Sequence, residues 1–70
     1  MRWPKFFPGD KVVLKRRWQI MYNGIGDSTG TVIEVEKTPS RLRYWVVFEG
    51  KKFSKSAYSY QLDLVHSDYD

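Results

Sequence analysis

The segment LRYWVVFEGKKFS, residues 42–54, decides the fold, because a run of strand-forming residues is followed by Glu49 and Gly50 and by a short segment, KKFS, that can pair with it. β-Branched and aromatic residues favour strands, and a short separator that contains glycine favours a hairpin. We therefore predict one strand over residues 42–48 and a second over residues 51–54, joined by a two-residue loop.

The register of this hairpin sorts its side chains onto two faces. With a two-residue loop, Val46 faces Phe53 and Val47 faces Lys52 across the pair. The core side then contains Tyr44, Val46, Phe48 and Phe53. The outward side contains Arg43, Trp45, Val47, Lys52 and Ser54. A slip of one residue would bury Lys52 and expose Phe53, so the pattern favours this register.

Three further strands are expected outside the hairpin. Short runs rich in Val, Ile and Leu occur at residues 11–15, 31–36 and 62–65, and turn-forming residues separate them. The apolar residues of the 31–36 run do not alternate cleanly, which predicts a bulge or a sharp bend near Ile33. Residues 56–61 are expected to form one helical or 3₁₀ turn before the last strand.

The chain length is that of one small domain. A chain of 70 residues removes only about 60% of its unfolded surface from water on folding. We expect a single domain over residues 1–70, with its core at residues 8–65 and an acidic tail at residues 66–70. The sequence contains no cysteine, which fits a reducing compartment. No apolar run approaches the roughly 20 residues of a membrane span, so we expect a soluble, cytoplasmic protein that makes no membrane contact.

Charge is distributed unevenly along the chain. Residues 1–60 contain all twelve Lys and Arg against five acidic residues, a net charge of +7, whereas residues 61–70 contain three Asp and have a net charge of −3. The folded body is therefore strongly basic. A basic body attracts polyanions and acidic protein surfaces alike.

Four segments resemble the successive strands of SH3-like barrels, namely FPGDKVVLK, GTVIEVE, YWVVFEG and YQLDLV. The resemblance includes the KOW-type barrels of ribosomal and transcription proteins, the peripheral SH3-like subunit of photosystem I, and short phage and bacterial barrels. It covers nearly the whole chain, about residues 8–65, and implies an all-β fold, a five-stranded SH3-like small barrel.

The sequence offers no evident catalytic, cofactor or metal site. Gly24, Gly26 and Gly30 precede a strand rather than a helix, so they lack the helix N-terminus that a phosphate-binding loop requires. His66 is the only histidine, and no serine has a histidine and an aspartate in evident reach. One histidine and scattered carboxylates do not make a tetrahedral metal site. We therefore expect a binding module without a cofactor, and not an enzyme.

Cations beside aromatic residues form the candidate binding site. One group lies at residues 15–18, at the end of the first expected strand and just after it. The other group lies on and next to the third and fourth expected strands. The candidates are Lys15, Arg16, Arg17, Trp18, Arg41, Arg43, Trp45, Lys51, Lys52 and Lys55. Arginines pair with phosphates or carboxylates, and a tryptophan offers a stacking plane. For Trp18 we favour packing over the end of the barrel, whereas Trp45 is either displayed among the cations or covered by residues 1–7.

Two functions fit this pattern. A nucleic-acid-binding module would use the cations to contact phosphates and a tryptophan to stack on bases. A protein-docking accessory module, or a phage-type modulator of a host protein, would use the same face against an acidic partner. Both functions need cations beside aromatic rings, so the sequence leaves the choice open.

Overall fold

The computed structural model describes residues 4–22 and 24–65 and consists mainly of one antiparallel β-sheet. The strands are β1 (Lys11–Leu14), β2 (Gly30–Lys37), β3 (Leu42–Phe48), β4 (Ser54–Ala57) and β5 (Leu62–Leu64). A one-turn helix, α1 (Arg16–Gln19), follows β1, and the 3₁₀ helix η1 (Ser59–Gln61) precedes β5. The prediction of an all-β fold with five strands is confirmed.

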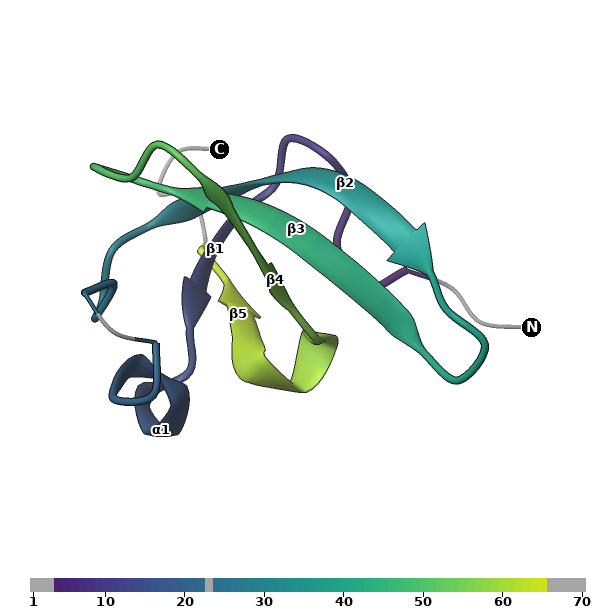
Figure 1. Cartoon of the computed structure of the whole chain (residues 1–70), viewed down its shortest axis with the longest axis horizontal. Coiled ribbons are helices and arrows are strands. Elements are labelled where there is room, and N and C mark those ends of the chain that lie inside the picture. Colours follow the sequence, from purple (N-terminus) through teal and green to yellow (C-terminus); the bar gives the residue numbers. More distant parts are fainter. Residues whose placement is uncertain (1–3, 23, 66–70) are drawn as a thin grey trace.

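The strand order in the sheet is β4-β3-β2-β1-β5, and each neighbouring pair is antiparallel. Figure 1 shows the long strands β2 and β3 side by side, with β1 and β5 below them and β4 crossing in front of β3. Within the described residues, β4 and β5 are the two edges and the sheet does not close between them. A closed barrel is therefore not observed.

The β2–β3 pair contains the predicted bulge. Its register shifts between Val32 and Glu34, and Ile33 is the extra residue on β2. The bulge allows Val32 and Val35 both to face the core, although an unbroken strand would turn residues three apart to opposite faces. The irregular apolar pattern of this strand thus has a structural cause.

The core is built from alternate residues of the strands and from the segment that precedes β1. It contains Phe6, Val12, Leu14, Ile25, Val32, Tyr44, Val46, Phe48, Ala57 and Leu62. The rings of Phe6 and Tyr44 meet edge to face, with 5.3 Å between their centroids. Tyr44, Val46 and Phe48 form the inward face of β3, as predicted.

The second arm of the hairpin differs from the prediction. Val47 pairs with Ser54 instead of Lys52, so the register is shifted by two residues, and β4 begins at Ser54, the last residue of the predicted strand. Phe53 lies in the connection and is 77% exposed, so the prediction that it joins the core is wrong. Lys52 is exposed, as predicted.

The geometry of the turn explains this difference. Gly50 has a φ of 81°, and the Lys51 amide donates a hydrogen bond of 3.0 Å to the Phe48 carbonyl. A positive φ at the third residue occurs in type I′ and type II turns, and a glutamate at the second residue favours type II, whose twist does not suit a two-residue hairpin. The chain therefore runs on through Lys52 and Phe53 before it pairs. Because the shift is two residues, the faces of β3 are unchanged.

The turn before the last strand is shorter than predicted. Of residues 56–61, the first two complete β4 and only Ser59–Gln61 form a 3₁₀ helix. Strand β5 ends at Leu64, one residue before the predicted limit. The predicted acidic tail at residues 66–70 lies outside the described residues.

Helix α1 is not predicted by the apolar pattern, because a single turn has no helical period to detect. It is closed by the amides of Trp18 and Gln19, which donate to the Lys15 carbonyl at 2.8 and 3.2 Å. Among the described residues, no helix has the length and apolar character needed to cross a membrane.

Candidate functional site

A pocket of about 330 Å³ opens beside η1, next to the first residues of β3. It is lined by Lys5, Arg41, Leu42, Tyr44, Tyr58, Ser59 and Tyr60. Among residues 4–22 and 24–65, the lining combines two cations with three tyrosines and includes no carboxylate. Such a lining favours a ligand that carries negative charge and also has a flat apolar face.

Four side chains form a continuous row, which we call the aromatic row: Arg41, Tyr58, Tyr60 and Trp18. The first three line the pocket, and Trp18 extends the row beyond it. The Arg41 guanidinium carbon lies 4.8 Å from the centroid of the Tyr58 ring. Tyr58 and Tyr60 are stacked, with centroids 5.9 Å apart and an interplanar angle of 12°. Tyr60 meets Trp18 edge to face at 5.8 Å. Because Tyr60 is 50% exposed, part of its ring is accessible to a ligand.

A buried glutamine holds η1 in place and thereby positions the two stacked tyrosines. Gln61 is 7% exposed, and its side-chain oxygen accepts a 2.8 Å hydrogen bond from the Tyr58 amide. The Tyr22 hydroxyl lies 3.2 Å from the same oxygen and 3.1 Å from the Ser56 carbonyl. Burial raises the pKa of Tyr22 above its ordinary value, so this hydroxyl stays protonated at neutral pH and acts as a donor. The long β1–β2 connection thus supports the turn that carries the row.

The inner wall of the pocket is fixed by Tyr44. Its ring is buried in the core, and its hydroxyl accepts a 2.7 Å hydrogen bond from the Lys5 amide. This bond ties the segment before β1 to the pocket, and the Lys5 side chain lies at the exposed rim. A cation is therefore placed on the side of the pocket formed by the N-terminal segment.

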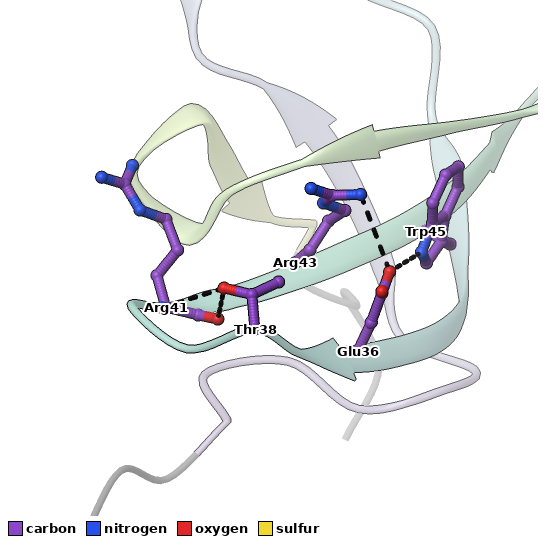
Figure 2. A network of polar contacts seen from close by, with 5 residues as sticks. All are labelled: Glu36, Thr38, Arg41, Arg43 and Trp45. Carbon is purple, nitrogen blue, oxygen red and sulfur yellow. Dashed lines mark hydrogen bonds and ion pairs between the residues drawn. The ribbon is translucent and has the colours of Figure 1, made fainter.

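Arg41 is positioned by a compact turn between β2 and β3. The Thr38 hydroxyl donates to the Arg41 carbonyl at 2.6 Å and accepts from the Arg41 amide at 3.1 Å. Figure 2 shows the Arg41 side chain extending away from this turn and apart from the Glu36 carboxylate. Only the backbone of Arg41 is hydrogen-bonded to Thr38, and its guanidinium lies against the Tyr58 ring.

A second cation and aromatic pair, Arg43 and Trp45, is engaged by a carboxylate instead. The Trp45 indole N–H donates to Glu36 Oε1 at 2.9 Å, and Arg43 Nη1 lies 3.8 Å from the same oxygen (Figure 2). Arg43 and Glu36 are direct partners across β3 and β2. The negative charge of Glu36 makes this face less suited to a polyanion than the pocket.

The other predicted site residues lie in two places. Lys15 forms an ion pair with Asp63 at 3.3 Å, and Arg16 and Arg17 are exposed on α1. Trp18 is half-buried, packs against the core and joins the aromatic row. The three remaining lysines, Lys51, Lys52 and Lys55, are exposed in and beside the β3–β4 connection. The structure therefore brings only Arg41 and Trp18 of the predicted residues to the row.

Sequence reasoning missed Lys5, Tyr58 and Tyr60. The available signal is the pair of tyrosines two positions apart in SAYSYQ, residues 56–61, just before the last strand. This segment indicates a turn, but nothing in it shows that Arg41 and Lys5 lie beside the rings.

Comparison with known proteins gives no match to any family model, curated protein or solved structure. Among residues 4–22 and 24–65, no group of three or more His, Asp or Glu is arranged to hold a metal ion.

Proposed function

We propose that this protein is an SH3-like small barrel, left half-open, that binds single-stranded nucleic acid in the pocket beside η1. The observation that supports the binding proposal most strongly is the pairing of Arg41 and Lys5 with two stacked tyrosines in a pocket to which the described residues contribute no carboxylate. The proposed role is binding, without catalysis.

The strand order supports the barrel part of the proposal. The two ends of the chain supply neighbouring strands, β1 and β5, and β2, β3 and β4 follow as a meander. A 3₁₀ turn leads into the last strand. This arrangement agrees with the resemblance of the four strand segments to SH3-like barrels, and it places η1 beside the open side of the sheet.

The chemistry of the pocket favours an unpaired base. Stacking of a base on an aromatic side chain contributes about 1–3 kcal/mol and requires an accessible ring face. Tyr60 already stacks on Tyr58 and contacts Trp18, yet it is 50% exposed, so the proposed base would stack on the part of its ring that these contacts leave open. Arg41 and Lys5 lie within reach of the same pocket and can pair with the phosphates on either side of the stacked base. Bases within a duplex are already stacked on their neighbours, so a single strand fits this site better.

An acidic protein partner would meet the same cations and rings, since tyrosine and arginine are also common anchors of protein interfaces. We favour nucleic acid because a stacked pair of rings beside two cations matches repeating bases and phosphates. Purification of nuclease-treated protein with one stoichiometric acidic protein, together with no affinity for oligonucleotides, would favour the alternative.

The first prediction concerns the dependence of binding on salt. We expect the protein to bind a fluorescein-labelled single-stranded oligonucleotide in low salt, with an affinity that falls steeply as salt is added. Arg41→Gln should weaken binding and reduce the slope of log K against log salt concentration by about 0.7, the value for one phosphate contact on a single strand. Fluorescence anisotropy measures both quantities.

Lys11→Gln is the matched control, because Lys11 is an exposed cation on β1 whose amine donates to Thr31 and does not line the pocket. It should change the affinity and the slope less than Arg41→Gln does. The absence of binding in low salt, or equal effects of the two variants, would contradict the proposed site.

A further inference from the structure

The connection between β3 and β4 displays an aromatic ring among lysines, away from the pocket. Phe53 is 77% exposed, more than Tyr60 in the pocket. Lys51, Lys52 and Lys55 lie within two residues of it and are also exposed. An accessible aromatic ring beside cations can stack on a base while the cations meet the neighbouring phosphates.

The charge of this segment indicates the class of partner. Residues 49–57 contain three lysines and one carboxylate, that of Glu49. Among the described residues, neither Lys52 nor Lys55 belongs to an ion pair. The Lys51 amine is directed to the β1–β2 connection, 3.1 Å from where a side chain at Gly24 would begin. Lys52 and Lys55 are therefore the cations best placed to meet an anionic ligand.

Strand β4 connects Phe53 to the proposed pocket. Strand β4 is an edge of the sheet and joins the β3–β4 connection directly to Tyr58. Figure 1 shows that connection and η1 at opposite ends of β4. At the rise of an extended chain, the five steps from Phe53 to Tyr58 span about 17 Å. Lys55 lies between these two aromatic positions.

We propose that β4 is the track of a single nucleic-acid strand, with one base held in the η1 pocket, phosphates on Lys55 and Lys52, and a second base stacked on Phe53. This inference rests on the proposed function and extends it to a binding site of several nucleotides, comparable with the smallest sites of about 4 nucleotides on barrels that bind single strands. A membrane surface is a poorer partner, because Phe53 stands alone between Lys52 and Ser54 and an interfacial anchor needs a larger apolar face.

The test compares a short and a long ligand, a trinucleotide and an octanucleotide of thymidine, by isothermal titration calorimetry with the wild-type protein and with Phe53→Ser. We expect Phe53→Ser to weaken octanucleotide binding by about fivefold or more, the loss of one stacking contact, and to leave trinucleotide binding unchanged. Tyr60→Ala should weaken the binding of both ligands. Ile33→Thr, which alters an exposed apolar residue at the β2 bulge, should change neither.

The outcomes separate the two proposals. If Tyr60→Ala weakens octanucleotide binding but Phe53→Ser weakens both ligands equally or neither, the track is wrong and the pocket stands. If the wild type binds neither oligonucleotide, the proposed function fails and the track fails with it. Phe53-dependent binding to anionic phosphatidylserine vesicles, without any dependence on oligonucleotide length, would also overturn the track. Because Phe53 is exposed, an unchanged thermal melt of Phe53→Ser confirms that a loss of binding is not a loss of folding.

Discussion

Replacing Tyr58 and Tyr60 together with alanine is expected to weaken the binding of single-stranded oligonucleotides by at least tenfold. The centroids of the two stacked rings are 5.9 Å apart, and the Arg41 guanidinium carbon lies 4.8 Å from the Tyr58 centroid. Removing both rings therefore removes the stacking surface and also the ring against which Arg41 packs. Each stacking contact contributes about 1–3 kcal/mol, which sets the size of the loss. Fluorescence anisotropy in low salt measures it.

The control for this variant is the double change of Tyr58 and Tyr60 to phenylalanine, which keeps both rings and removes only the hydroxyl groups. It should bind nearly as well as the wild type. Since Gln61 receives its hydrogen bond from the Tyr58 backbone amide, the phenylalanine variant also keeps the turn intact. Equal binding by the alanine variant and the wild type would show that the rings do not contact the ligand.

Gly30→Ala is expected to lower the free energy of unfolding by about 1–3 kcal/mol, the usual cost of forcing extra atoms into a packed core. A Cβ at this position would lie 2.4 Å from Val46 Cγ1 and 2.8 Å from Phe48 Cδ1. Both of these side chains are fully buried, so neither can move aside into solvent. Urea denaturation measures the change.

The neighbouring change Thr31→Ala serves as the comparison, because Thr31 is only half-buried and its hydroxyl accepts a single surface hydrogen bond from Lys11. It should cost less than Gly30→Ala. A Gly30→Ala variant as stable as the wild type would mean that β2 and β3 are not packed as closely as described.

Strands β1, β2, β3 and β5 could be predicted from sequence because each is a local pattern, whereas β4, Ser54–Ala57, lacks such a pattern and begins three residues later than predicted. Strand β3 follows from five consecutive β-branched and aromatic residues at 44–48, and the bulge at Ile33 follows from a break in the alternation. The hairpin register could not be predicted, because it depends on which turn residue has a positive φ. Gly50 has the positive φ, and the chain after it runs on through Phe53 before it pairs with β3. Phe53 therefore stays exposed and does not join the core.

The pocket could not be predicted because its parts are distant in the sequence. Lys5, Arg41 and Tyr60 come from three separate segments, and only the folded sheet places them together. Sequence reasoning instead grouped cations with the aromatic residues next to them in the chain. For Trp45 this grouping omitted Glu36, which approaches from the neighbouring strand and engages its indole N–H.

The most direct test of the central claim is a titration of ¹⁵N-labelled protein with a single-stranded oligonucleotide in low salt, followed by NMR of the backbone amides. We predict that the largest chemical-shift changes fall on Lys5, Arg41 and residues 58–60, around the pocket. Changes centred on the Glu36, Arg43 and Trp45 cluster, or no changes at saturating oligonucleotide, would contradict the claim that this pocket binds nucleic acid.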